Sequence, residues 1–193
     1  MSKIYLLLGG TRSGKSTFGE KLAASFSDKV AYIATAKITD KEMEKRIVQH
    51  RRRRPAYWKT YEIKNFPVRN KDIDNILANI KSEKINTLLI DCITNLLFAV
   101  IDEYDLSDRE TVSNKVEEEI EKKVISFFKV FLSKLQSYNL NIIMISNEIG
   151  MGVVPAFPLG RIFRDLMGII NKEISSVADE VYLFIAGLKQ RLK

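Results

Sequence analysis

The sequence of 193 residues contains a single cysteine, Cys92, and a single histidine, His50. One cysteine excludes an intrachain disulfide and fits a reducing compartment, and one cysteine with one histidine cannot assemble a four-ligand structural zinc site. No apolar stretch approaches the ~20 residues that cross a bilayer, and residues 1–8 lack the charged start and cleavage site of a secretory signal. We therefore expect a cytoplasmic protein without a membrane span.

The chain also lacks linkers, internal repeats and low-complexity segments. It has four prolines, and no Pro-, Gly- or Ser-rich stretch divides it. Its length is sufficient for one domain with a sizeable core. We expect a single domain over residues 1–193.

Positive charge is in excess, with a formal net charge of +7, and much of the surplus lies in the run Arg51–Arg54. Such a run is compatible with a solvated surface, a small-molecule phosphate site or a nucleic-acid patch, and by itself it does not distinguish them. Near the run, aromatic side chains that could stack on bases are limited to Tyr57 and Trp58, which weighs mildly against nucleic acid.

Residues 9–16 read GGTRSGKS and match the pattern G-x-x-x-x-G-K-[ST]. An apolar run at 4–8 predicts a strand before this loop, and residues 16–24 predict an amphipathic helix after it, which is the expected context of a phosphate-binding P-loop. Backbone N–H groups, the helix N-terminus and Lys15 would bind phosphate, and the Ser16 hydroxyl would hold magnesium.

Strands and helices alternate along the rest of the chain. Apolar runs predict strands at 29–35, 86–91 and 140–146 and a final strand at 181–186, with a weaker one at 58–63. Apolar residues at intervals of three or four predict a long helix over 112–135. The sequence therefore predicts an α/β, P-loop NTPase-like fold with a mostly parallel sheet and helices on both faces.

Further candidate residues follow the predicted strands. Residues 35–37 are either part of the P-loop crevice or a plain connector. Asp91 ends an apolar strand, where P-loop proteins place an acid near magnesium. Residues 147–155 form a loop with two glycines and a proline, and Arg161 and Arg164 on the next predicted helix either reach phosphate or form surface salt bridges.

His50 belongs to a helix predicted to begin at the capping box of residues 39–42 and to run toward Arg54. It shares one helix face with Met43 and Ile47. A lone histidine on an apolar face is usually structural, but neighbouring arginines would keep the ring neutral, which is the form needed for attack on phosphorus. Both interpretations remain open from the residues alone.

Several of these stretches together resemble the bifunctional adenosylcobinamide kinase / adenosylcobinamide-phosphate guanylyltransferase family. The matching segments cover nearly the whole chain: residues 9–16, 32–36, 42–43, 46–47, 50–51 and 54–55 with Trp58, 91–94, 147–155, and Arg161, 163–165, Gly168 and Asn171. The P-loop is shared with many families, whereas the segments around His50 and over 147–155 are specific to this one.

The resemblance implies an enzyme of cobalamin biosynthesis that uses ATP or GTP to phosphorylate adenosylcobinamide and then transfers GMP from GTP to adenosylcobinamide phosphate. It implies that His50 carries the guanylyl group. From the P-loop pattern and the acid at the strand end, we expect Lys15 to be catalytic as well and Ser16 and Asp91 to hold magnesium. The resemblance further implies a homotrimer, small-molecule substrates and no nucleic-acid partner. The nucleotide-binding residues by this resemblance are Gly9, Gly10, Thr11, Arg12, Ser13, Gly14, Lys15, Ser16, Thr35, Ala36, Lys37, Arg51, Arg52, Arg53, Arg54, Glu62 and Asp91.

Two alternatives remain at this point. In the first, the chain is a P-loop small-molecule kinase in which His50 is structural. In the second, it is a nucleic-acid-associated NTPase that grips phosphates with Arg51–Arg54. No residue stands out as the base for the substrate hydroxyl, although Asp91 could either hold magnesium or take that proton.

Overall fold

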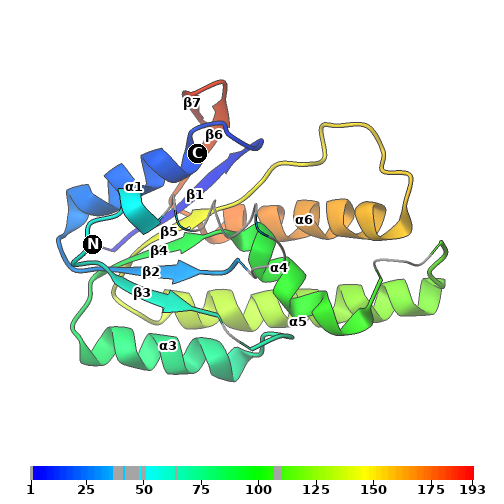
Figure 1. Cartoon of the computed structure of the whole chain (residues 1–193), viewed down its shortest axis with the longest axis horizontal. Coiled ribbons are helices and arrows are strands. Elements are labelled where there is room, and N and C mark those ends of the chain that lie inside the picture. The colour runs from blue at the N-terminus through cyan, green and yellow to red at the C-terminus, as the bar shows by residue number, and fades with distance from the viewer. Residues whose placement is uncertain (1, 37–40, 42–47, 49–50, 64, 107–109) are drawn as a thin grey trace.

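The computed structural model describes residues 2–36, 41, 48, 51–63, 65–106 and 110–193, and these residues build a seven-stranded sheet (Figure 1). Across the sheet the order is β3 (Lys59–Glu62), β2 (Val30–Ala34), β4 (Thr87–Asp91), β5 (Asn141–Ile145), β1 (Ile4–Gly9), β6 (Glu180–Ile185) and β7 (Leu188–Arg191). The pairings from β3 to β6 are parallel, and β7 runs antiparallel to β6. The mostly parallel sheet predicted from the sequence is confirmed.

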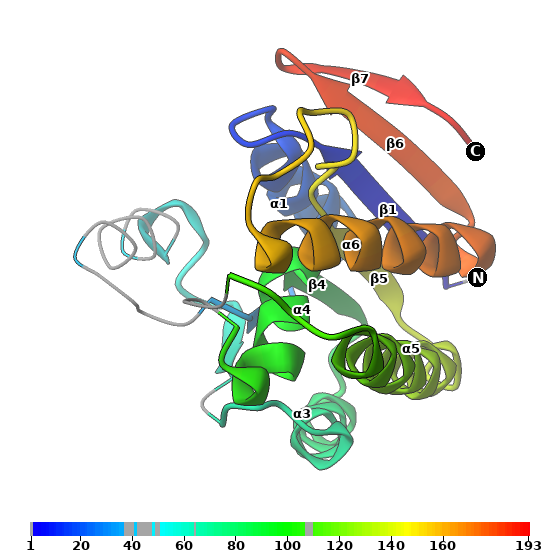
Figure 2. The ribbon, with the colours of Figure 1, turned by 90° about the vertical axis from the view of Figure 1, so that its right-hand side faces the viewer.

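Helices cover both faces of this sheet, as predicted. One face carries α1 (Lys15–Phe26), and the other carries α3 (Asn70–Ser82), α4 (Ile93–Ile101), α5 (Asn114–Gln136) and α6 (Pro158–Val177). A short 3₁₀ turn, η1 (Asp102–Tyr104), follows α4. Figure 2 shows α4, α5 and α6 together on the side of the sheet away from α1.

Successive side chains of each strand point to opposite faces, so two cores form. Leu6, Ile33 and Ile90 are buried with the four helices, whereas Leu7 and Leu89 are buried with α1. Burial on both faces explains why these strands read as continuous apolar runs. Gly19 lets α1 lie close to the sheet, since a Cβ at this position would stand only 3.0 Å from Cδ1 of Ile145.

Two elements were not predicted from the sequence. Helix α4 is apolar around most of its circumference and nearly wholly buried, so it has no polar face to mark a helical period. Strand β7 is exposed along its whole length and pairs with β6 through its backbone. The prediction that the strand near residues 181–186 is the last one is therefore wrong.

Among the helices that the structure describes, none combines the length and apolarity needed to cross a bilayer.

Candidate functional site

The P-loop joins the end of β1 to the start of α1, and its backbone requires glycine at two points. Gly9 has φ 147°, and a Cβ there would lie 2.3 Å from the carbonyl oxygen of Phe184. Gly14, with φ 97°, is the N-cap of α1. The N–H of Glu148 donates to the Gly9 carbonyl (3.1 Å) and that of Gly187 donates to the Ser13 carbonyl (3.2 Å). The loop is thereby held between the segments that follow β5 and β6.

Lys15 lies across this loop with its side chain buried. Its Nζ donates to the carbonyl oxygens of Gly9 (2.8 Å) and Gly10 (2.7 Å) and approaches Oγ of Ser13 at 3.4 Å. Burial lowers the pKa of Lys15, while the nearby Cys92 and Asp91 oppose this effect. A phosphate oxygen would give the ammonium a charged acceptor, which is a stronger partner than a carbonyl. The lysine therefore stands where the loop and the N-terminus of α1 favour an anion.

The parallel strands β2, β4 and β5 end side by side, because Ala34 is in register with Asp91 and Asp91 with Ile145. We call the side of the sheet where the parallel strands end the carboxyl edge, and the side where they begin the amino edge. Thr35 is buried, and its hydroxyl accepts from the N–H of Cys92 (2.7 Å) and donates to the Cys92 carbonyl (2.8 Å). Its side chain thus fastens β2 to β4, with Ala36 directly after it. Burial raises the pKa of the Cys92 thiol to about 11, so this thiol stays protonated at neutral pH.

Asp91 has a specific neighbour in Tyr32, whose hydroxyl donates to Oδ2 of Asp91 at 3.0 Å. The guanidinium group of Arg54 lies over the Tyr32 ring, with its Cζ 3.6 Å from the ring centre, in a cation–π contact. Burial, followed by the Asp91 charge, raises the pKa of Tyr32, so the phenol remains a neutral donor. Tyr32 therefore orients one carboxylate oxygen of Asp91.

The arginine run divides into two pairs. Arg51 and Arg52 are exposed, whereas Arg53 forms an ion pair with Glu20 (Nη2 to Oε1, 3.6 Å) and Arg54 stacks on Tyr32. Half of the run is thus engaged with the protein. His50, which directly precedes the run, and Lys37 lie outside the described residues.

Glu62 ends β3 in register with Ala34, so it too faces the carboxyl edge, with its side chain exposed. Strands β2, β4 and β5 separate β3 from β1, which places Glu62 roughly 19 Å from the P-loop strand. The structure therefore brings Lys15, Thr35 and Asp91 close together and places Glu62 at the far end of the same edge.

Residues to which the sequence analysis gave no role fix the segment after β5. Ser146 Oγ donates to Oδ1 of Asn171 (2.6 Å), and Nδ2 of Asn171 donates to the carbonyl of Asn147 (3.0 Å). The N–H of Asn147 in turn donates to the Thr94 hydroxyl (3.0 Å). These contacts join α4, β5 and α6, which are distant in sequence. The contacts of Tyr32 and Glu20 were not predicted for the same reason, because they also join residues distant in sequence. Tyr32 contacts Asp91, 59 positions later, and Glu20 contacts Arg53, 33 positions later.

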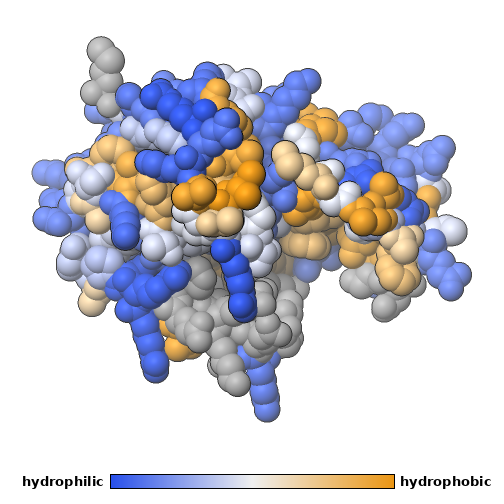
Figure 3. Space-filling model, turned by 90° about the horizontal axis from the view of Figure 1, so that it is seen from above, coloured by the Kyte–Doolittle hydropathy of each residue, from blue (hydrophilic) through white to orange (hydrophobic). Residues whose placement is uncertain are grey.

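The loop that follows this segment presents large apolar side chains to solvent, among them Met151, Val153, Val154 and Phe157. Figure 3 shows the molecule from above, with hydrophobic areas lying between hydrophilic ones on this face. Arg161 braces the end of the loop by donating to the carbonyls of Ala156 (2.6 Å) and Pro155 (3.2 Å). Arg164 pairs with the adjacent Asp165 at 2.8 Å, the surface ion-pair alternative considered from the sequence.

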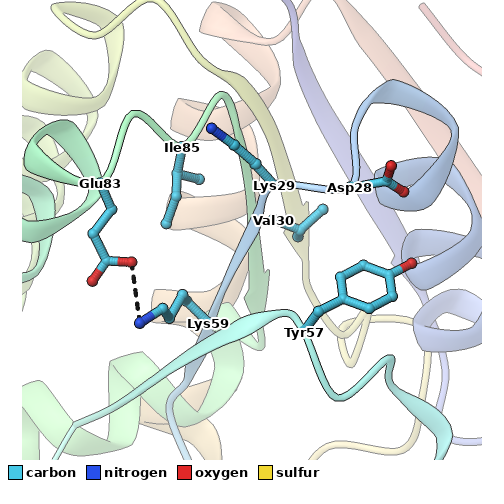
Figure 4. Close-up of a pocket in the computed structure, with 7 residues that line it drawn as sticks. All are labelled: Asp28, Lys29, Val30, Tyr57, Lys59, Glu83 and Ile85. Carbon is cyan, nitrogen blue, oxygen red and sulfur yellow. Dashed lines mark ion pairs between the residues drawn. The ribbon is translucent and has the colours of Figure 1, made fainter.

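A separate hollow of about 600 Å³ lies at the opposite edge of the sheet (Figure 4). It includes Val30 and Lys59, the first residues of β2 and β3, and Glu83, which forms an ion pair with Lys59 at 3.4 Å. It therefore lies at the amino ends of the strands, away from the P-loop. We place the functional site at the carboxyl edge, where the buried polar groups converge.

Comparisons with known proteins give matches over nearly the whole chain. Residues 5–192 match the model of the family described as "Cobinamide kinase / cobinamide phosphate guanyltransferase". The chain is 33% identical to the bifunctional adenosylcobalamin biosynthesis protein CobU of Escherichia coli, over 98% of this chain and 99% of that protein. It is 37% identical to the corresponding protein CobP of Pseudomonas aeruginosa, over 97% of this chain and 96% of that protein.

Among solved structures, the chain is similar to an ATPase from the type III secretion system of pathogenic bacteria. The TM-score is 0.59 at 12% identity, and the match covers 98% of this chain and 56% of the ATPase. At this identity the likeness concerns the fold alone, and it agrees with the predicted P-loop NTPase-like architecture. The family match over residues 5–192, with relatives at 33% and 37% identity over nearly their whole length, shows that the chain belongs to the cobinamide kinase / cobinamide phosphate guanyltransferase family.

Proposed function

We propose that this chain is a cytoplasmic enzyme in which one domain carries two activities of adenosylcobalamin biosynthesis. It phosphorylates the hydroxyl of adenosylcobinamide with a nucleoside triphosphate, and it then transfers GMP from GTP to the phosphate so formed. The observation that carries the proposal is the buried Lys15 held across the P-loop beside Asp91, in a chain whose family match covers residues 5–192.

The nucleotide phosphates bind at the P-loop. Backbone N–H groups at the N-terminus of α1 and the Lys15 ammonium hold them and stabilise the charge that develops during transfer. Positioning and electrostatics dominate such reactions, so a rigid loop is suited to them. The contacts of Glu148 and Gly187 with the loop supply this rigidity.

Ser16 and Asp91 are the residues that would hold magnesium. A hydroxyl and a carboxylate are hard oxygen ligands, and Tyr32 orients the carboxylate. Among the described residues there is no group of three or more His, Cys, Asp or Glu side chains placed to bind a metal. With only the Ser16 hydroxyl and the Asp91 carboxylate as protein ligands, the ion would complete its coordination with phosphate oxygens and water. When bound, magnesium neutralises phosphate charge.

Guanylyl transfer proceeds through His50. The neutral imidazole attacks the α-phosphorus of GTP, so that a P–N bond forms while the bond to the pyrophosphate oxygen breaks and pyrophosphate leaves. A phosphate oxygen of adenosylcobinamide phosphate then attacks the same phosphorus, and the histidine is released as the leaving group. Support comes from the position of His50 directly before Arg51–Arg54, of which Arg54 contacts Tyr32 beside Asp91.

The test is covalent labelling with GTP that carries the label in the α-phosphate. We expect an acid-labile protein adduct, no adduct from GTP labelled in the γ-phosphate, and release of the label when adenosylcobinamide phosphate is added. His50→Ala should abolish the adduct and preserve phosphorylation of adenosylcobinamide. Label retained by His50→Ala would contradict the histidine assignment, and phosphorylation without any wild-type adduct would identify a kinase alone.

A homotrimer is the assembly that the family resemblance implies, and we propose it here. The exposed apolar side chains Ile185, Leu188 and Leu192 at the β6–β7 edge offer a surface that a second copy could cover. Sedimentation equilibrium should then give three times the chain mass of 22.1 kDa. Leu188→Glu should shift this mass toward that of the single chain, and an unchanged mass would place the interface elsewhere.

A further inference from the structure

Glu20 is a charged side chain on the P-loop helix that the mechanism above does not use. Its side chain is only 12% exposed, and its buried Oε1 makes no hydrogen bond within the described part of the chain. Among the described residues Arg53 forms an ion pair with it, with Nη2 3.6 Å from Oε1. Burial raises the pKa of Glu20, Arg53 and Arg54 oppose the shift, and Asp91 adds to it. The carboxylate is thus surrounded by charges of the nucleotide site and of the arginine run.

These charges form one cluster drawn from three parts of the chain. Helix α1 supplies Glu20, the end of β4 supplies Asp91, and the run after residue 50 supplies Arg53 and Arg54. Tyr32 connects Arg54 with Asp91, because its ring stacks with the Arg54 guanidinium and its hydroxyl donates to Asp91. The cluster therefore fastens the segment that directly follows His50 to the helix and strand that bear the phosphate-binding and magnesium-binding residues.

We propose that Glu20 is a positioning residue for guanylyl transfer, which holds Arg53, and with it the segment after His50, against the P-loop helix. The inference rests on the proposed function, since it concerns the step in which His50 attacks GTP. An ion pair with a half-exposed arginine adds little to global stability. A displacement of about 1 Å at a reacting group, however, can cost about 100-fold in rate. The effect of Glu20 is therefore expected in the rate of transfer.

The test compares Glu20→Gln and Glu20→Ala with Lys21→Gln, a matched control that also removes a charge from α1, at an exposed position. We expect both Glu20 variants to form the α-phosphate-labelled adduct about 10- to 100-fold more slowly. Their affinity for a ribose-labelled fluorescent GTP analogue should stay within about threefold of wild type, and Lys21→Gln should match wild type in both measurements.

Two results in this experiment would overturn the inference. One is an unchanged rate of adduct formation. The other is a parallel loss of rate and of nucleotide affinity, which would mean that Glu20 only supports the P-loop. If Glu20 acts through Arg53, the double variant with Glu20→Gln and Arg53→Gln should form the adduct no more slowly than Arg53→Gln alone, and a further loss of rate would contradict the inference.

Limited trypsin digestion measures the same contact without any turnover. Cleavage after Arg51, Arg52 and Arg53 should be several-fold faster in Glu20→Ala than in wild type or Lys21→Gln, because the segment is no longer held. Equal cleavage in all three proteins contradicts the inference, whether or not GTP labels the protein. Absence of an adduct from wild type, with faster cleavage of Glu20→Ala, would instead refute the transferase mechanism and leave the positioning contact established.

Discussion

The two edges of the sheet are built from the same strands, and they differ in how their polar side chains are held. At the carboxyl edge Lys15 and Thr35 are almost fully buried, and their polar atoms bond to the ends of neighbouring strands and to the P-loop. At the amino edge a hollow of about 600 Å³ is lined by the exposed pair of Lys59 and Glu83. We therefore base the proposed site on the convergence of buried polar groups and not on the size of a hollow.

The largest effect is expected at the carboxyl edge from Lys15→Ala. The variant removes the charge that we propose binds phosphate and leaves the P-loop backbone in place, so both phosphorylation and GMP transfer should fall at least about 100-fold. Steady-state assays of each activity measure this, with Lys21→Ala on the exposed face of α1 as the control. Retention of either activity would show that this activity uses another phosphate site.

Asp91→Asn should come next. It keeps the size of the side chain and its contact with Tyr32 but removes the charge that would attract magnesium. The magnesium concentration for half-maximal phosphorylation should rise at least about 10-fold, with most of the activity regained at high magnesium. A fall in activity that magnesium does not restore would instead assign Asp91 to the transfer of the substrate proton.

Tyr32→Phe tests the orientation of that carboxylate with a smaller expected effect. The ring under Arg54 is preserved, and the hydrogen bond to Asp91 is lost. Groups that orient a metal ligand typically contribute about 10-fold or more to metal affinity, so we expect a magnesium requirement about 10-fold higher. Magnesium titration of the phosphorylation rate measures it, and a curve that overlays wild type would mean that Asp91 is held without this bond.

Asn171→Leu addresses the segment after β5. The change leaves the hydroxyl of the fully buried Ser146 and the carbonyl of Asn147 without their partner, at a cost of about 2 kcal/mol. For a chain of this size the melting temperature should fall by roughly 4–8 °C, and activity should fall a few-fold. Thermal unfolding measures the change, with the adjacent Lys172→Ala as the control. An unchanged melting temperature would show that water replaces the amide.

What could be predicted from the sequence follows from how local each signal is. The P-loop is defined within eight residues, because strand, glycine turn and helix follow one another directly. Asp91 could be proposed from its place at a strand end. Its distance from Lys15, however, depends on the strand order, in which only β5 separates β4 from β1. No local sequence motif determines this order.

The contacts that were missed all join segments far apart in sequence. Arg54 was expected to contact nucleotide, and its contact with Tyr32 arises because residues 51–58 pack on the same face of the sheet as α1. The apolar helix α4 offered no periodicity to detect, and β7 offered no apolar side toward a core. Such features come from tertiary packing, which a single sequence does not encode as a local pattern.

The smallest effect is expected at the amino edge, from the double variant with Lys59→Gln and Glu83→Gln. The two side chains are 62% and 36% exposed and 3.4 Å apart, so their ion pair contributes at most about 1 kcal/mol. Both activities should stay within about twofold of wild type, and the melting temperature within about 4 °C. A loss of either activity beyond 10-fold, at unchanged stability, would mean that the hollow shown in Figure 4 binds a substrate. The contrast between the two edges would then no longer hold, because buried and exposed polar groups would serve the reaction equally.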